Sequence, residues 1–223
     1  NAPPTADAGG PYLVAVDSTI QLDGMGTDPD GDPLTYAWSS DEAGSSFDSI
    51  TPPATSEDPL YTAASTPGIY ELTLNVDDGQ ANASDTAMVV VYDSDGGFVT
   101  GGGWILSPDG ACPGCEESPE GKANFGFVAK YRRGADVPSG NTQFQFQAGD
   151  LNFHSTSYEW LVVAGNKAQF KGEGTINGEG SYKFMLSADD DDPDTFRIQI
   201  WGGTGTYYDN GSQQALGGGS IKV

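Results

Sequence analysis

The chain has 223 residues, of which 36% are hydrophobic, enough for one large hydrophobic core or two small ones. Its 32 acidic and 9 basic residues give a formal net charge of -23. Phosphate backbones and anionic lipids repel such a chain, so nucleic acid and membrane surfaces are disfavoured as partners. The sequence contains no apolar run of twenty residues, so no membrane insertion is predicted.

The charge is unevenly distributed along the chain. Residues 1–93 hold 16 acidic residues and neither lysine nor arginine, whereas residues 94–223 hold the other 16 acids and all 9 bases. High salt or bound divalent cations make such charge tolerable. Most of the scattered acids need no explanation beyond a solvated surface, but clusters of acids do.

Residues 1–93 show short strand patterns separated by turn signals, and this spacing predicts a β-sandwich. Tyr36 and Trp38 share one face of their strand, and the hydroxyl of Tyr70 is placed to cap a turn as a tyrosine corner. We expect all three aromatic side chains in the core. The predicted strands are Leu13–Val16, Thr19–Leu22, Leu34–Ser39, Asp58–Ala63, Ile69–Val76 and Thr86–Tyr92.

Three aspartates, Asp28, Asp30 and Asp32, lie within five residues of the loop TDPDGDP. Carboxylates two residues apart in a short loop can face one ion, and Ca²⁺ takes six to eight oxygen ligands at about 2.3–2.6 Å. The loop is not an EF-hand, because its glycine is fourth and Ser39 stands at the twelfth place. The alternative is an Asx-rich turn held only by hydrogen bonds to its own backbone.

The first segment resembles a PKD domain, an immunoglobulin-like module. The resemblance rests on APPTADAGGPY (residues 2–12), DPDGDPLTYAW (28–38) and PGIYELTLNVDDG (67–79). It implies an immunoglobulin-like sandwich over residues 1–93. One departure is that SSDEAG follows Trp38, where the family usually has an Asp-Phe-Gly-Asp-Gly turn.

The resemblance also implies a calcium ion where the N-terminal end meets the aspartate loop and the turn before the last strand. Asp32 and Asp77 are then neighbours that support the loop. An extracellular module of this kind binds Ca²⁺ weakly, with a Kd on the order of 10⁻⁴–10⁻³ M. Carried over by position, the ligands are the Asn1 side chain, the Ala2 carbonyl, Asp28, Asp30 and Asp78.

Residues 94–97 read as a short polar linker, and residues 98–223 as a second all-β domain, predicted to be a sandwich. Phe144 and Phe146 alternate strictly with polar residues in NTQFQFQAG, and glycine runs indicate close approach of strands. The predicted strands lie in 122–133, 141–149, 158–163, 168–176, 182–188 and 195–201.

This second segment resembles a C-terminal domain that follows PKD or immunoglobulin-like repeats in large secreted microbial proteins. The motifs that carry the resemblance are GGGWI, GKANFGFVAKY, AGDLNFHSTSYEWLVV, DPDTFRIQIW and ALGGGSI. It implies an extracellular accessory role without an established activity.

The run ADDDDPDTF (188–196) is a second acidic cluster. Such a run is most often a solvated turn. A speculative second calcium site would use carboxylates of this run and of a loop downstream, with Asp150 as a further candidate. Its residues are Asp190, Asp192, Asp194 and Asp209.

The two cysteines, Cys112 and Cys115, form the motif CPGC. A zinc site would need two more ligands, and a redox motif would need a thioredoxin-like context that is missing. A short structural disulfide is therefore predicted, with a pair of free thiols as the alternative.

The sequence gathers no catalytic machinery. His154 is the only histidine and lies in an alternating strand pattern, and no serine lies in a nucleophile-elbow motif. Paired carboxylates are abundant, but hydrolysis of glycosides needs them at a defined separation in a cleft. We predict that the chain is not an enzyme.

The predicted function is an extracellular, calcium-binding structural or adhesive module of a microbial surface or secreted protein. Its partners would be other extracellular subunits or copies of itself. The alternative is a carbohydrate-binding accessory domain of a secreted hydrolase, which would show a flat row of exposed aromatic side chains. The candidates for stacking on sugar rings are Trp104, Trp160, Trp201, Tyr207 and Tyr208.

Overall fold

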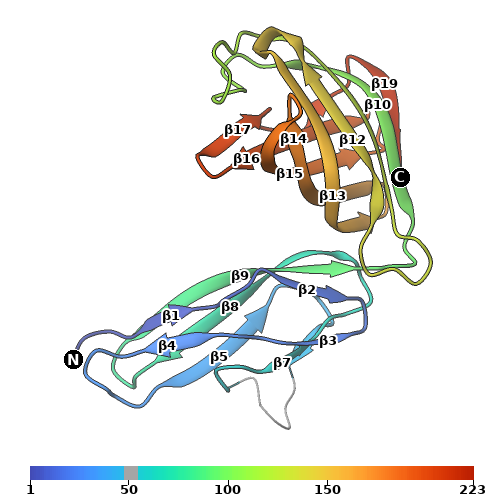
Figure 1. Cartoon of the computed structure of the whole chain (residues 1–223). Coiled ribbons are helices and arrows are strands. Elements are labelled where there is room, and N and C mark those ends of the chain that lie inside the picture. Colours follow the sequence, from blue (N-terminus) through green and yellow to red (C-terminus); the bar gives the residue numbers. More distant parts are fainter. Residues whose placement is uncertain (48–54) are drawn as a thin grey trace. The chain divides into compact units, whose positions relative to one another are not determined.

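The computed structural model describes residues 1–47 and 55–223, and their regular structure is β apart from one 3-10 turn at Gln147–Gly149. This confirms the prediction of an all-β chain. The chain divides into two compact units, Asn1–Asp93 and Ser94–Val223 (Figure 1).

The first unit is built from three small sheets. A four-stranded sheet has the order β2-β9-β8-β5, a three-stranded sheet the order β3-β7-β6, and β1 pairs with β4. All pairs are antiparallel except β2 with β9, which is parallel. The strands are β1 (Thr5–Asp7), β2 (Tyr12–Ala15), β3 (Thr19–Gln21), β4 (Met25–Thr27), β5 (Thr35–Ser40), β6 (Ser46–Phe47), β7 (Leu60–Thr62), β8 (Gly68–Asp77) and β9 (Asn82–Tyr92).

The core of the first unit lies between its sheets. Alternate residues of β8 and β9 point inward, and Trp38 of β5 and Tyr61 of β7 are buried against them. Tyr70 donates a hydrogen bond to the carbonyl of Thr66 at 3.0 Å, which confirms the tyrosine corner. Tyr36 is partly buried against the same core, as expected.

The segment SSDEAG, which departs from the family pattern, has a structural role in this unit. It places Glu42 in the interior, where its carboxylate accepts hydrogen bonds from the hydroxyl of Tyr61 and from the backbone N–H of Ala64. Burial raises the pKa of Tyr61 to about 12, so its hydroxyl remains a donor. A buried carboxylate with two donors replaces the usual turn.

The second unit is a single ten-stranded antiparallel sheet in which β10 to β17 pair in chain order. β18 pairs with β16, and β19 returns to pair with β10 at the opposite end. The strands are β10 (Phe98–Ser107), β11 (Gly121–Lys130), β12 (Ser139–Phe146), β13 (Leu151–Ala164), β14 (Lys167–Ile176), β15 (Glu179–Asp189), β16 (Thr195–Gly202), β17 (Gly205–Asp209), β18 (Gln214–Ala215) and β19 (Gly218–Lys222).

The sheet curls so that its halves face each other across an aromatic core. Phe125 of β11 stacks on Phe196 of β16 with ring centroids 4.0 Å apart, although these strands are not neighbours in the sheet. Tyr208 of β17 donates a hydrogen bond to Ser107 at the end of β10. The two layers predicted as a sandwich are therefore halves of one continuous sheet.

The two glycine runs meet where β10 pairs with β19. Gly103 lies opposite Gly219, and a Cβ at Gly103 would come within 2.3 Å of the carbonyl oxygen of Gly218. Gly219 has a φ of +110°, a conformation that other residues rarely adopt. These glycines permit the close approach that the sequence predicted, and the segment from β18 to β19 joins both ends of the sheet.

Candidate metal centre

The aspartate loop connects β4 to β5 and is organised around Asp28. One oxygen of its carboxylate, Oδ1, accepts hydrogen bonds from the backbone N–H groups of Asp30 at 2.9 Å and Asp32 at 3.0 Å. Gly31, with a φ of +78°, donates to the Asp28 carbonyl and turns the chain. These bonds are those of an Asx-type turn, so the self-contained turn predicted as the alternative is present.

The turn alone leaves two features unexplained. Asp28, Asp30 and Asp32 each offer a carboxylate oxygen, and these oxygens lie within 4.8 Å of one another. The other oxygen of Asp28, Oδ2, is buried and has no hydrogen-bond partner in the described residues. A buried, unpaired carboxylate oxygen is costly, because it has lost its water without gaining a donor.

A calcium ion fits this arrangement. Two oxygens that share one Ca²⁺ can be separated by at most twice the metal–oxygen distance, roughly 4.6–5.2 Å, and the oxygens of the three carboxylates, all within 4.8 Å of one another, are close enough for this. The ion would satisfy Asp28 Oδ2 and remove the mutual repulsion of the aspartates. Residues 1–93 contain no lysine or arginine to do this instead, and the N-terminal ammonium group, 4.0 Å from Asp30 Oδ2, offsets part of the charge of Asp30.

The N-terminal residues contact the loop, as the resemblance implies. The backbone N–H of Ala2 donates to Asp30 Oδ2 at 2.7 Å, and the side-chain amide of Asn1 donates to Asp78 Oδ2 at 3.0 Å. A chain of hydrogen bonds thus links the N-terminal end, the aspartate loop and the turn between β8 and β9. Asp78 lies outside the group of three carboxylates, and Asn1 and Ala2 make these contacts through N–H groups, so ligation by Asn1, Ala2 and Asp78 stays a prediction.

Asp78 is held in its ionised form by these contacts. The hydrogen bond from Asn1, together with the backbone N–H groups of Ala81 and Gln80, lowers the pKa of Asp78 below its ordinary value of 3.8. Neighbouring Asp77 accepts a hydrogen bond from the N–H of Gly79 and stabilises the turn. Asp32, which the sequence placed only beside the site, contributes its carboxylate directly to the group of three.

The residues of the speculative second site have other partners. Asp190 forms an ion pair with Lys222 at 2.9 Å, and Asp194 accepts the backbone N–H of Ile221 at 2.7 Å. In the described part of the chain, no group of three metal-binding side chains other than the aspartate loop comes within 4.8 Å. The described residues thus provide no second cluster of carboxylates for an ion, and Asp192 belongs to no such group.

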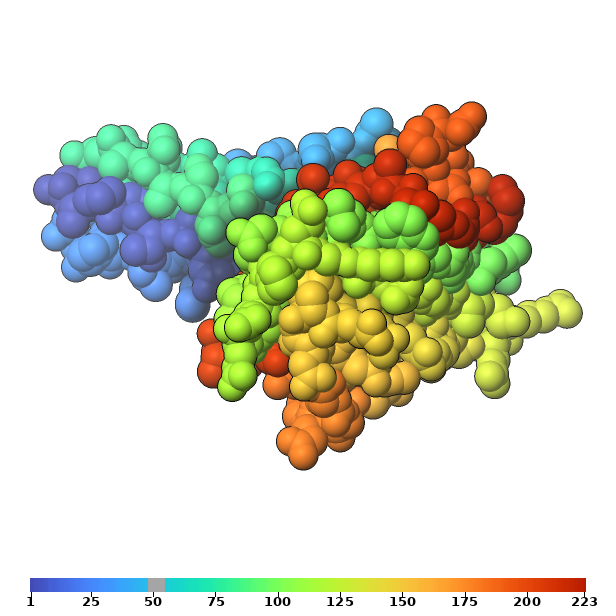
Figure 2. Space-filling view, turned by 90° about the horizontal axis from the view of Figure 1, so that it is seen from above, coloured from blue at the N-terminus to red at the C-terminus, as the bar shows by residue number. Residues whose placement is uncertain are grey.

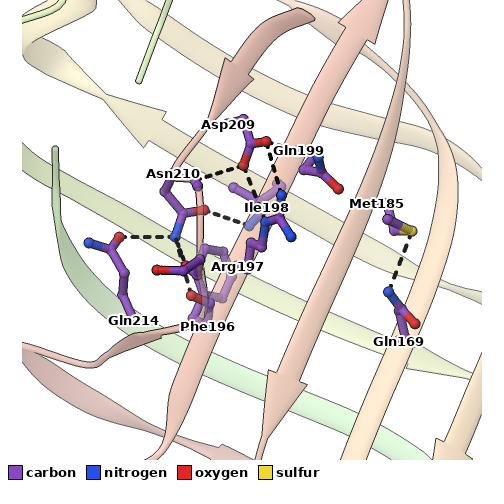
Figure 3. Close-up of polar contacts among 11 residues, drawn as sticks. Gln169, Met185, Phe196, Arg197, Ile198, Gln199, Asp209, Asn210 and Gln214 are labelled. Carbon is purple, nitrogen blue, oxygen red and sulfur yellow. Dashed lines mark hydrogen bonds and ion pairs between the residues drawn. The ribbon is translucent and has the colours of Figure 1, made fainter. Parts of the chain in front are cut away.

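Asp209, the fourth residue of that site, is tied to the outer face of β16. It pairs with Arg197 at 3.0 Å and accepts a hydrogen bond from Gln199 at 2.9 Å, as Figure 3 shows. Burial raises the pKa of Asp209, but the bonds from Arg197, Gly211 and Gln199 outweigh burial and lower it. Adjacent Asn210 is buried. Its side-chain oxygen accepts a hydrogen bond from the backbone N–H of Ile198, and its side-chain nitrogen donates one to the carbonyl of Phe196.

The remaining singled-out residues lie in the second unit. Cys112 and Cys115 are joined by a disulfide. The loop that carries it and the hairpin between β12 and β13, including Asp150, line a hollow of about 340 Å³. In Figure 2 the yellow-green and amber segments of the second unit lie against each other. Among the candidate stacking residues, Trp160 and Tyr208 are buried and the other three are half-buried, so they form no exposed aromatic row.

Comparison with known proteins identifies the first unit. Residues 1–91 match the family model of the PKD domain. Residues 1–91 are a PKD domain. PKD domains are extracellular modules that are typically non-catalytic, and they are followed in this chain by a second β domain. No helix in the described residues has the length and apolar character needed to cross a bilayer.

Other comparisons add little. No curated protein matches the chain. Two crystal forms of human protocadherin-24 EC1-2 are similar at 15% and 17% identity, each covering 85% of this chain and 88% of that one, with TM-scores of 0.29 and 0.31. Extracellular domains 3–5 of Drosophila OTK are 7% identical, with 93% of each chain covered and a TM-score of 0.26. Likenesses this low carry no information on function.

Proposed function

We propose that the PKD domain binds one Ca²⁺ ion through the aspartate loop and that the chain serves as an extracellular structural or adhesive module. The buried, unpartnered Oδ2 of Asp28 carries this proposal, since it lies in a group of three carboxylates that no basic side chain neutralises. The donors are hard oxygen ligands, which suit Ca²⁺.

The ion would act on the structure by joining separate segments. Asp28, Asp30 and Asp32 come from one loop, whereas Asn1, Ala2 and Asp78 come from the N-terminal end and the β8–β9 turn. Hydrogen bonds already connect these segments, and a shared ion would hold them more firmly. Segments joined by an ion in this way would make the PKD domain stiff, as suits a module of a microbial surface or secreted protein. Its partners would be other extracellular subunits or further copies of the chain.

The test is calcium titration of the whole chain by isothermal calorimetry. We expect one binding event with a Kd on the order of 10⁻⁴–10⁻³ M. Asp30→Asn removes one ligand charge and should weaken binding by about tenfold or more. Asp17→Asn is the matched control, because Asp17 is exposed in the same unit, has a φ of 54° that asparagine tolerates, and makes no side-chain hydrogen bond or ion pair with another of the described residues.

Two results would contradict the proposal. One is a titration in which the unmodified chain takes up no Ca²⁺ at millimolar concentration. The other is an equal loss of affinity in Asp30→Asn and Asp17→Asn, which would mean that binding follows overall charge rather than the aspartate loop.

A further inference from the structure

The outer surface of β10–β13 in the second unit differs in chemistry from the rest of the chain. Side chains alternate along β11–β13, with the phenylalanines directed inward and mostly polar residues directed outward, and Trp104 of β10 lies on the outward side. The strand register sets the outward residues in rows that cross the sheet. One row is Trp104, Asn124, Gln145 and Asn152, and the next is Gly102, Gly126, Gln143 and His154.

These two rows, which we call the amide face, contain no charged residue in a chain with 32 acids. The outer face of an antiparallel sheet is ordinarily polar because it meets water. If this face only had to be solvated, aspartate and glutamate, which are abundant elsewhere in the chain, would be sufficient. Side-chain amides differ from carboxylates because each offers both donors and an acceptor.

The amides of this face are available to a ligand. The side chains of Asn124, Gln143, Gln145 and Asn152 make no hydrogen bond to another of the described residues. They line a hollow of about 390 Å³ together with His154 and Gly126. That volume lies within the range of about 300–1,000 Å³ typical of ligand sites.

Gly126 leaves the floor of the hollow open. It lies between Gly102 and Gln143 in its row, and a Cβ built on it meets no atom within 4 Å. At one end of the neighbouring row, Trp104 is half-buried, and the ammonium group of Lys122 lies 4.7 Å from the centre of its ring. The face therefore combines an open floor, unpaired amides and one aromatic ring at its edge.

From this combination we propose that the amide face binds a neutral, hydroxyl-rich polysaccharide. Hydroxyl groups both donate and accept hydrogen bonds, as do amides, and they carry no charge that would need a basic partner. Acidic glycans would need lysine or arginine in the hollow, where none is found among its lining residues. This proposal goes beyond calcium binding and is independent of it, because every residue involved belongs to the second unit.

The experiment is native electrophoresis of the whole chain in gels that contain laminarin, dextran, galactomannan or hydroxyethyl cellulose, with alginate as the acidic probe. We expect at least one neutral polymer to retard the unmodified chain. Gly126→Val places a branched side chain in the hollow, where its Cβ meets no atom within 4 Å, and valine suits a strand, so it should abolish retardation while leaving the melting temperature unchanged or higher.

Asn124→Ala and Gln145→Ala each remove one amide and should weaken binding by about tenfold. Gln169→Ala is the matched control, since Gln169 is a half-buried amide on β14 outside the hollow. Retardation by none of the neutral polymers, retardation by alginate alone, or full retention of binding in Gly126→Val would each overturn the proposal. Gels are run with Ca²⁺ and with a chelator. Retardation should be the same in both, because the amide face does not include the proposed calcium site.

Discussion

The two acidic clusters of this chain have similar sequences and different surroundings. In the PKD domain the aspartate loop is met by its own backbone and by Asn1 and Ala2, with no basic side chain in residues 1–93. In the second unit, Lys167 pairs with Asp189 and Lys222 pairs with Asp190. The two clusters thus differ in their partners: basic side chains meet the acids of the second unit, whereas the aspartate loop leaves Asp28 Oδ2 without a hydrogen-bond partner in the described residues.

The largest expected effect is that of calcium on the two units. Ca²⁺ at 100 times its Kd should stabilise the PKD domain by about 2.7 kcal/mol. For a domain of this size, that corresponds to a rise in melting temperature of roughly 10 °C or more. Calorimetry of the chain with Ca²⁺ and with a chelator should show this rise in one transition only.

The unit that shifts can be identified by the Asp30→Asn variant. With Ca²⁺ binding weakened about tenfold, the rise in the melting temperature of the PKD domain at the same Ca²⁺ concentration should fall to about half. Equal shifts of both transitions would remove the distinction between the two clusters. No shift in either would leave Asp28 Oδ2 without the partner we assign to it.

A smaller effect on stability is expected from substitution of Asp194, whose carboxylate stabilises the second unit through a hydrogen bond within the protein. Asp194→Ala removes the acceptor for the backbone N–H of Ile221 in β19, and should lower the stability of this unit by about 1–2 kcal/mol. The loss should be the same with Ca²⁺ and with a chelator. Asp136→Ala, at an exposed position of the same unit, is the control and should change little. A loss for Asp194→Ala that appears only when Ca²⁺ is present would restore a metal to this cluster.

The smallest effect concerns pH and Asp78. Because its folded pKa is lowered, ionised Asp78 contributes stability above its ordinary pKa of 3.8, and this contribution is lost as pH falls through the folded value. Asp190 is shifted in the same direction, chiefly by Lys222. Carboxyl titration by NMR should give both groups a pKa below the ordinary value of 3.8. Added Ca²⁺ should lower the apparent pKa of Asp78 further but leave that of Asp190 unchanged. A Ca²⁺ response in Asp190 instead would contradict the comparison.

Sequence patterns predicted much of the local structure. Alternation of apolar residues located most of the longer strands, although several extend further than expected, as β13 does by beginning at Leu151 rather than Tyr158. The glycine-rich strand β10 (Phe98–Ser107) and the strands after residue 202 were not predicted. The Pro-Gly turn before Tyr70 predicted that its hydroxyl caps a turn, and the structure shows the carbonyl of Thr66 as the partner. These features depend on neighbours in the chain, which a local pattern can register.

Long-range features were harder to predict. Nothing in the periodicity of β19 indicates that it pairs with β10, or that Lys222 reaches Asp190. The spacing of Asp28 and Asp30 suggested shared ligation, but the burial of Asp28 Oδ2 depends on packing that no sequence window contains. The partners of the aspartates after Ala188, among them Lys167 and Lys222, also depend on long-range packing, so the sequence alone suggested a metal site there.

The pairing of β10 with β19 has a consequence for how the second unit is made. Its first strand is synthesised early and its partner strand last, so one edge of β10 stays unsatisfied until Gly218–Lys222 has left the ribosome. Folding of this unit should therefore be a late, non-local event that is slow compared with hairpin formation. During that interval the glycine-rich edge is open to mispairing with other chains, which makes the final strand a safeguard against aggregation as well as a structural element.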